Sequence, residues 1–175
     1  RVRFKPDDKI FGKGCEFKPN RLYTMARSKA YLFGGVKIRW SCDPSLIGDK
    51  DKTPVEAELH FPGGLKDYLA STIEGSTRIA GDLFAGRVDK AEGHGSVEWA
   101  IAWIADRDGF SSSYCNTIPT PEGGTHESGF RSAILRALKA HGELVGNRKS
   151  GLITAEDIMA SSGAMLSVFI REPEF

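Results

Sequence analysis

The segment from Pro119 to Glu127 carries the residue types with most chemical content. Two glycines, Gly123 and Gly124, stand directly before an expected helix, with Thr125 placed to cap its first turn and His126 beside it. Glycines in such a turn can leave backbone N–H groups free for a phosphate at the positive end of the helix. The segment lacks the Lys-Ser/Thr pair of a P-loop and the third glycine of a dinucleotide fingerprint. Two interpretations are open: an anion-binding turn, and a helix cap that binds no ligand.

The helix that follows, expected from about Thr125 to Leu144, carries cations on the side away from its apolar residues. At about 100° per residue its packing side gathers Phe130, Ala133, Ile134, Ala137, Leu138 and His141. Arg131, Arg136 and Lys139 fall within an arc of roughly 140° that faces away. Cations on one helical face can follow a phosphate backbone, but a solvated face without a partner has the same pattern.

Signatures of catalysis and of metal binding are missing from the sequence. It has no GxSxG or HExxH motif, and no cysteine has a histidine nearby in the sequence. The histidines and cysteines are scattered without ligand or CxxC spacing: His60, His94, His126, His141, Cys15, Cys42 and Cys115. We therefore expect no catalytic residue, no metal site and no disulfide framework, with the cysteines packed as small hydrophobes in a reducing compartment.

Alternating helices and strands must position these residues. Helices are predicted over 19–33, 65–73, 125–144 and 155–160, and strands over 2–5, 36–42, 56–61, 84–90, 97–105, 110–117 and 164–170. The three strands between 84 and 117 follow one another closely, with turns at 92–95 and 106–109, which predicts an antiparallel meander. The pattern indicates an α+β sandwich in which helices pack on one face of a mixed or antiparallel sheet.

The middle strand of this predicted meander has one bulky and one small face. Val97, Trp99, Ile101 and Trp103 point one way, whereas Ala100 and Ala102 point the other. We expect the bulky face to meet a layer of helices and the tryptophans to be core residues rather than platforms for stacking a ligand.

Length and charge set the limits for these interpretations. The 175 residues suffice for one core, and no apolar stretch approaches the ~18 residues of a membrane span. The net charge of +1 hides an asymmetry: residues 1–42 contain 11 Lys and Arg against 3 Asp and Glu, a net charge of +8, whereas residues 43–110 have a net charge of −6. The basic part is compatible with a polyanionic partner and with an ordinary solvated surface.

Several motifs occur in an order typical of one family. They are Val2 to Asp7, Ala26 to Leu32, Asn116 to Ile118, Glu122 to His126, Gly129 to Arg131, Ser167-Val168 and Pro173 to Phe175. In the order of these motifs the whole chain resembles the second, or transducer, domain of the ATPase subunit (the B-subunit) of bacterial type II DNA topoisomerases. DNA gyrase and topoisomerase IV share this domain. Residues 31–36, 39–42 and 61–65 are more similar to the topoisomerase IV version.

The resemblance implies a fold like domain 2 of ribosomal protein S5 and a role in coupling ATP binding and hydrolysis to DNA strand passage. It also implies that the helix after the Gly-Gly-Thr-His motif turns basic residues toward the transported DNA, first Arg131, then Arg136 and Lys139. The parent would be an ATP-hydrolysing isomerase that uses ATP and Mg²⁺ and works with double-stranded DNA, with the tyrosine-bearing A-subunit and with its own ATP-binding domain. Its location would be the bacterial cytoplasm, associated with the nucleoid.

On this interpretation the chain is a fragment. Residues 1–175 would be one transducer domain, residues 1–18 being the tail of the preceding ATP-binding domain, and the ATP-binding and metal-binding domains would be absent. The family's Gly-Gln-Thr-Lys loop would follow Phe175. Such a fragment is expected to be a non-catalytic monomer without a cofactor of its own.

Two other functions remain open at this point. A stand-alone nucleic-acid-binding module of S5-like fold would use the basic N-terminal third and the Arg131 face. A small hydrolase would have only Ser111 to Ser113 and His126 to use, which we interpret as strand and cap residues.

Overall fold

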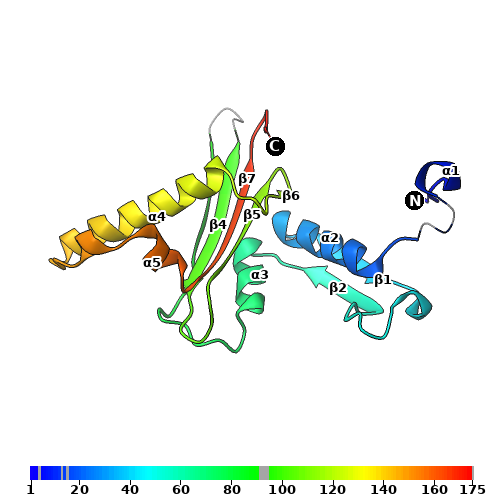
Figure 1. Cartoon of the computed structure of the whole chain (residues 1–175), viewed down its shortest axis with the longest axis horizontal. Helices are drawn as coiled ribbons and strands as arrows, with labels where there is room; N and C mark the ends of the chain where they lie inside the picture. The colour runs from blue at the N-terminus through cyan, green and yellow to red at the C-terminus, as the bar shows by residue number, and fades with distance from the viewer. Residues whose placement is uncertain (4, 13, 15, 91–94, 175) are drawn as a thin grey trace.

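A five-stranded mixed sheet forms the centre of the computed structural model, which describes residues 1–3, 5–12, 14, 16–90 and 95–174 (Figure 1). Its strands are β3 (Phe84–Asp89), β4 (Ser96–Trp103), β5 (Phe110–Cys115), β6 (Ile118–Pro119) and β7 (Ser162–Phe169), in the order β3-β4-β7-β5-β6. The strand β7 runs antiparallel to β4 and parallel to β5. The expected α+β class with a mixed sheet is confirmed.

The sheet order corrects the predicted antiparallel meander. Strands β3 and β4 pair as expected, but the last strand, β7, lies between β4 and β5. Its residues from Ser162 to Val168 are all buried, whereas β3 is mostly exposed. A strand that is buried on both faces gains most from a central position, which explains why β7 separates strands that are consecutive in sequence. The turn predicted at 92–95 lies mostly outside the described residues.

Helices α4 (Thr125–Leu144) and α5 (Ala155–Met159) pack on the bulky face of β4, as expected. On this face Ile101 is fully buried and Trp103 Nε1 donates a hydrogen bond to the Ile158 carbonyl at 3.0 Å. The 3₁₀ turn η3 (Ser150–Leu152) joins α4 to α5. This arrangement is the helical layer predicted for one face of the sheet.

The opposite face is also covered, which the sequence did not indicate. Helix α3 (Leu65–Thr72) buries Leu65 and Leu69 against the small face of β4, where Ala100 and Ala102 let the helix approach closely. The core on this side also contains Met165 of β7. Figure 1 shows α3 and α4 on different sides of the sheet.

The N-terminal unit consists of α2 (Pro19–Leu32) and a separate antiparallel pair, β1 (Lys37–Ser41) and β2 (Glu56–His60), joined by a loop with the 3₁₀ turn η1 (Pro44–Leu46). Helix α2 begins with Pro19 as predicted and ends before Gly34 and Gly35, the latter with a φ of +89°. The predicted strand over 2–5 is wrong for its described residues, which have no strand to pair with. A short helix, α1 (Asp8–Phe11), capped by Asp7, follows instead.

Polar contacts of Lys29 and Tyr31 help to join α2 to the central sheet. Lys29 Nζ donates to the carbonyl of Thr117 at 3.2 Å and to its hydroxyl. The hydroxyls of Tyr31 and Tyr114 lie 2.6 Å apart in the core, and burial followed by this hydrogen bond raises the pKa of Tyr31 far above its ordinary value. The Tyr31 ring also stacks on Tyr68 of α3, with centroids 3.9 Å apart. The C-terminal end of α2 is therefore fixed to β5, to α3 and to the turn after β5.

Candidate functional site

The turn between β5 and β6 positions the residues of the site. Asn116 and Thr117 have φ angles of 48° and 69°, the left-handed pair that suits a two-residue hairpin. The turn brings Thr120 back to Ser113, whose carbonyl accepts the Thr120 N–H at 2.9 Å. The Asn116 amide also donates to the Ile170 carbonyl at 2.8 Å and accepts the Ile170 N–H at 2.9 Å. One turn thus joins β5, β6 and the end of β7.

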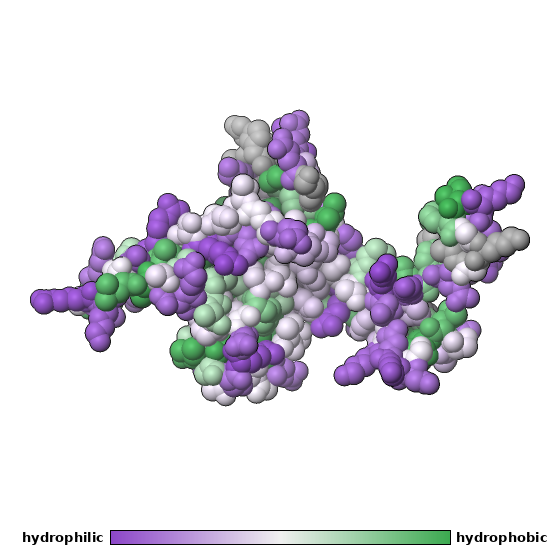
Figure 2. Space-filling view, in the orientation of Figure 1, coloured by the Kyte–Doolittle hydropathy of each residue, from purple (hydrophilic) through white to green (hydrophobic). Residues whose placement is uncertain are grey.

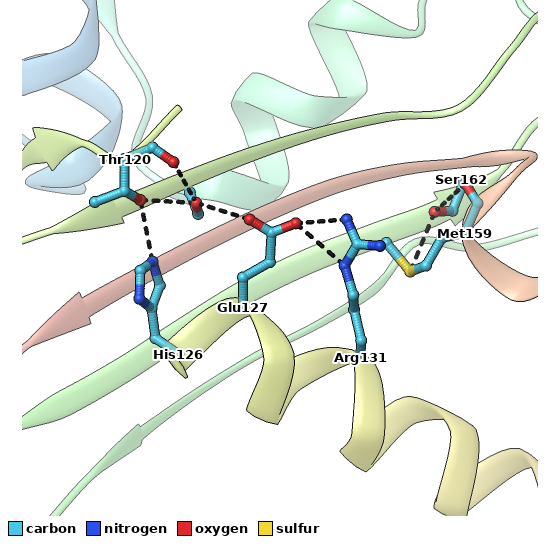
Figure 3. A network of polar contacts seen from close by, with 7 residues as sticks. Thr120, His126, Glu127, Arg131, Met159 and Ser162 are labelled. Atoms are coloured by element: carbon cyan, nitrogen blue, oxygen red, sulfur yellow. Dashed lines mark hydrogen bonds and ion pairs between the residues drawn. The ribbon is translucent and has the colours of Figure 1, made fainter. Parts of the chain in front are cut away.

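A chain of hydrogen bonds links this hairpin to the start of α4 (Figure 3). Thr120 Oγ1 lies 3.0 Å from His126 Nε2 and 2.8 Å from Ser113 Oγ. Ser113 Oγ in turn lies 3.3 Å from Glu127 Oε2. The single Ser113 hydroxyl proton has two acceptors at 3.3 Å, Glu127 Oε2 and the Thr120 carbonyl. Because that proton is used there, Thr120 Oγ1 donates to Ser113 Oγ and accepts the Nε2 proton of His126.

The chain ends in an ion pair on α4. Glu127 Oε1 accepts hydrogen bonds from Arg131 Nε at 3.1 Å and from Arg131 NH2 at 2.6 Å. The Glu127 side chain is 15% exposed and that of Arg131 is 41% exposed. Burial alone would raise the pKa of Glu127, but the hydrogen bonds and charge of Arg131, with hydrogen bonds from Ser113 and Ser111, outweigh it and lower that pKa. Glu127 is therefore a carboxylate with both oxygens occupied.

Helix α4 is rotated relative to the sequence prediction. Its least exposed positions are His126, Glu127, Phe130, Arg131, Ile134, Leu135, Leu138, Lys139 and Gly142. Ala133, Ala137 and His141, which were expected to pack, are exposed. The hydrogen bond between Glu127 and Ser113 of the sheet fixes one end of the helix. At the other end, Gly142 has no Cβ, and this makes room for Ser150 and lets the helix lie close to η3. Apolar periodicity alone could not reveal these polar and glycine contacts.

The three predicted cations consequently do not share one outward face. Arg131 lies within the packed side of α4 and points to Glu127 (Figure 3), Arg136 is exposed, and Lys139 is half-buried. The carboxylate of Glu127 holds the guanidinium of Arg131 in a defined geometry.

The predicted helix cap also differs. Helix α4 begins at Thr125, so that Gly124 occupies the capping position and no side chain caps the helix. The φ angles of Gly123 and Gly124 are +78° and +153°, and a Cβ at Gly124 would lie 2.8 Å from His126 Cε1. The glycines thus serve the turn and the placement of His126. An anion-binding role for Gly123, Gly124, Thr125 and His126 stays a prediction.

An open groove of about 950 Å³ runs between this turn and the end of the sheet. Val88, Val97, Cys115 and Val168 form its apolar floor, and the residues from Pro119 to His126 form one wall. Among the residues that the structure describes, its charged lining consists of Lys90, Glu122, Glu172 and Glu174. Three carboxylates against one ammonium disfavour an anion in this groove.

Both ends of the long axis carry exposed charged residues beside exposed apolar ones. Figure 2 shows hydrophilic and hydrophobic residues side by side over the N-terminal unit and over the far end of α4, where Leu144 and Val145 are exposed. In the N-terminal part the exposed cations are Arg1, Arg3, Lys5, Lys9, Lys18, Arg21, Lys37 and Arg39. Lys37 and Arg39 are neutralised in part by Glu58, at 2.9 Å and 3.7 Å.

Sequence reasoning missed the polar partners of the site. The sequence did not pair Ser113 and Thr120 with Glu127, nor Glu127 with Arg131, although the four-residue spacing of the last two is a known pattern for a helical ion pair. Nothing in the sequence pairs Ser113 with Glu127, because they lie on different elements. Among the residues that the structure describes, no group of three His, Cys, Asp or Glu side chains is placed to hold a metal ion.

Comparison with known proteins bears on both the fold and the site. The profile of the DNA gyrase B family matches residues 64–175, which is more than half of the chain and includes the sheet, α3, α4 and the Gly-Gly turn. The chain belongs to the DNA gyrase B family. Two similar proteins are the B-subunit of DNA topoisomerase 4 from Caulobacter vibrioides, 59% identical over 178 residues, and that from Bartonella bacilliformis, 52% identical over 175 residues. The alignments cover 99% and 100% of this chain but 25% of each relative.

A solved member of the family has the same arrangement of elements. The 43K ATPase domain of Thermus thermophilus gyrase B is 28% identical, with a TM-score of 0.73, over 98% of this chain and 44% of that domain. The expected transducer fold, like domain 2 of ribosomal protein S5, is confirmed for this member of the gyrase B family. The resemblance to the topoisomerase IV version of the ATPase subunit is likewise confirmed, because the match at 59% identity spans nearly the whole chain. Of the described helices, none has the length and apolar character needed to cross a membrane.

Proposed function

We propose that this chain is the transducer domain of the B-subunit of a topoisomerase IV, the ATPase subunit of a type II DNA topoisomerase. The observation that carries the proposal is the 59% identity to the corresponding subunit of DNA topoisomerase 4 across 99% of the chain. The chain spans a quarter of that relative's length, so other parts of the parent would supply further functions. Residues 1–18 would be the tail of a preceding ATP-binding domain.

In this proposal the parent binds ATP and Mg²⁺ in its ATP-binding domain and passes one DNA duplex through another together with the A-subunit. The present chain would transmit the effect of ATP, without catalysing a reaction and without a cofactor of its own. The fragment alone would be a monomer. A bacterial topoisomerase acts on the chromosome, so we infer a cytoplasmic, nucleoid-associated location.

The contacts of α2 support a transmitting role. Any shift of α2 acts on Thr117 through Lys29, and the neighbouring Asn116 holds the end of β7 through Ile170. The same hairpin leads to Thr120 and hence to the hydrogen-bond chain at the start of α4. A movement of the N-terminal unit would therefore shift both the C-terminal end of β7 and Arg131.

The DNA contact in this proposal is made by α4. Arg136 is exposed, Lys139 is half-exposed, and the Arg131 guanidinium retains N–H donors beyond the two that face Glu127. These groups can bind phosphate oxygens without reading sequence, which suits an enzyme that transports DNA of any sequence.

The test uses the full-length ATPase subunit that contains this chain, assembled with the A-subunit. We expect Arg131→Gln to reduce the stimulation of ATP hydrolysis by duplex DNA, and strand passage with it, by roughly tenfold, the loss expected for one charge-assisted phosphate contact. Hydrolysis without DNA should change little, because the proposal assigns Arg131 to the DNA contact and not to ATP binding. Unchanged DNA stimulation would remove Arg131 from the interface.

A stand-alone nucleic-acid-binding module is the second candidate, favoured by the +8 charge of residues 1–42. It predicts that the isolated chain binds duplex DNA tightly, with affinity falling steeply as salt rises. The transducer proposal expects weak binding by the isolated chain. Fluorescence anisotropy with a labelled duplex at two salt concentrations separates the two functions.

A further inference from the structure

Arg131 is the cation on which the proposed DNA contact depends, yet its side chain is already engaged. The edge of the guanidinium formed by Nε and NH2 faces Glu127 Oε1 at 3.1 Å and 2.6 Å. This is one of the two edges through which arginine can bind a phosphate in bidentate fashion; the other is formed by the two terminal nitrogens. A phosphate must therefore displace Glu127 to use the edge that contains Nε, or must bind a guanidinium whose charge a carboxylate neutralises.

Glu127 is not a loosely placed surface carboxylate. Its side chain is only 15% exposed, and its second oxygen accepts a hydrogen bond from Ser113 of β5. Ser113 is itself buried and held by Thr120, which His126 fixes in turn. The carboxylate is thus anchored to the sheet, and the anchor keeps Arg131 on the packed side of α4.

We propose that Glu127 is a positioning residue that competes with DNA phosphate for Arg131 and so weakens the response of α4 to DNA. The inference rests on the proposed function, and it adds that Glu127 restrains Arg131. Exchange of Glu127 for a phosphate would free the Arg131 side chain from its link to the sheet. Until that exchange occurs, Arg136 and Lys139 would make the first contacts with the duplex.

Glu127→Gln in the full-length ATPase subunit tests this restraint, because the amide keeps the size and a hydrogen bond but loses the charge. With the A-subunit present, we expect the duplex concentration for half-maximal ATPase stimulation to fall by about threefold to tenfold at low salt, a range typical of losing one partly exposed charge partner. The slope of log affinity against log salt should steepen by up to about 0.9, because the Glu127 carboxylate no longer offsets the charge that Arg131 offers to phosphate. A purely structural role of Glu127 would not change this slope.

The matched control is Glu143→Gln, which removes the same charge from an exposed position on the same helix. It should shift the half-maximal concentration by less than about twofold, because exposed charges act only weakly through screened solvent. In the double variant Glu127→Gln with Arg131→Gln, the gain should disappear and the response should equal that of Arg131→Gln alone. Ser113→Ala, which keeps the carboxylate but removes its anchor, should give a smaller gain and serves if Glu127→Gln folds poorly.

The results separate this inference from the proposed function. If Arg131→Gln weakens the DNA response while Glu127→Gln and Ser113→Ala leave it unchanged or weaken it, the competition is overturned and the DNA contact stands. A gain from Glu127→Gln that persists in the double variant also overturns it. If Arg131→Gln has no effect at all, the DNA contact of Arg131 itself fails.

Discussion

The ion pair of Glu127 and Arg131 shows how a single carboxylate can engage a cation that appears free in the sequence of a basic helix. Arg131 counts as a surface cation in the sequence, whereas in the structure it faces a carboxylate that is bonded to β5. Glu127 has a lowered pKa and hence keeps its charge at neutral pH. The carboxylate is therefore available to pair with Arg131 under physiological conditions, and another anion must compete with it for the guanidinium.

This pair should contribute to stability in a defined range of pH. A carboxyl whose folded-state pKa is lowered stabilises the fold above its unfolded-state pKa of about 4.5, and that contribution is lost as pH falls through the folded-state value. We expect Glu127→Gln to lower the free energy of unfolding at pH 7 by roughly 0.5 kcal/mol. Urea unfolding of the variant and of the unmodified chain measures this difference.

The same comparison at an acidic pH below the folded-state pKa of Glu127 gives the control for that prediction. The difference between the two proteins should have largely disappeared there, because the carboxyl of Glu127 is then protonated. Other carboxyls with lowered pKa, such as Glu58 and Asp157, are common to both proteins and cancel in the difference. A stability difference that is equal at both pH values would show that the charge of Glu127 does not stabilise the fold.

At this scale the sequence indicated some members of the observed hydrogen-bond chain but not the direction in which their side chains point. Arg131 and His126 were both singled out, and both belong to the observed hydrogen-bond chain. Their orientation depends on Ser113 and Thr120, which come from another part of the fold, and side-chain hydrogen bonds across elements leave no periodic signal in a sequence.

At the scale of the element, helix α4 contains two glycines with opposite roles. A Cβ at Gly129 would meet no other atom within 4 Å, whereas a Cβ at Gly142 would overlap the side chain of Ser150. Glycine inside a helix costs about 0.5–1 kcal/mol relative to alanine. Alanine substitutions at the two positions therefore separate the effect of helix propensity on stability from the effect of packing.

We expect Gly129→Ala to raise the free energy of unfolding by about 0.5 kcal/mol and Gly142→Ala to lower it by roughly 1–3 kcal/mol, the usual cost of overpacking. Chemical denaturation followed by circular dichroism measures both. Adding Ser150→Gly to Gly142→Ala should recover part of the loss, since the clashing side chain is then gone. Equal effects of the two single substitutions would contradict the close contact between α4 and η3.

The helices and strands themselves were predicted well from the sequence, but the order of the strands in the sheet was not. Pro19 and the Gly34-Gly35 pair mark the ends of α2, and the alternating residues of β4 identify its two faces. Strand order depends instead on pairings between distant segments, such as Ile101 with Ala164. Local patterns contain no information on such pairings, and this is why the predicted meander was wrong while its strands were right.

At the scale of the whole molecule, the N-terminal unit and the sheet are joined through few side chains. Tyr31 of α2 is the centre of this junction, since it bonds Tyr114 and stacks on Tyr68. Arg27, one turn earlier, lies over the Tyr68 ring at 4.8 Å from its centroid. The junction is aromatic and buried, so its polar atoms depend on one another.

Tyr31→Phe should destabilise the chain by about 1–2 kcal/mol, because it leaves the buried Tyr114 hydroxyl without its partner. The double variant Tyr31→Phe with Tyr114→Phe should lose less than the sum of the two single losses, which urea unfolding of the four proteins would reveal as a coupling energy. Strict additivity would mean that the two hydroxyls do not interact. Lys29→Met, which leaves the aromatic core intact, should weaken only the contact with Thr117.

The central position of β7 also governs how a newly made chain can fold. Ser162–Phe169 is the last of the described strands to be synthesised, and until it emerges both β4 and β5 lack the neighbour that each has in the finished sheet. Pairings between segments so far apart in sequence form slowly, and open strand edges attract other unfinished chains. The chain is therefore most prone to aggregate before the ribosome has released this strand, and chaperones that cover strand edges should raise its yield.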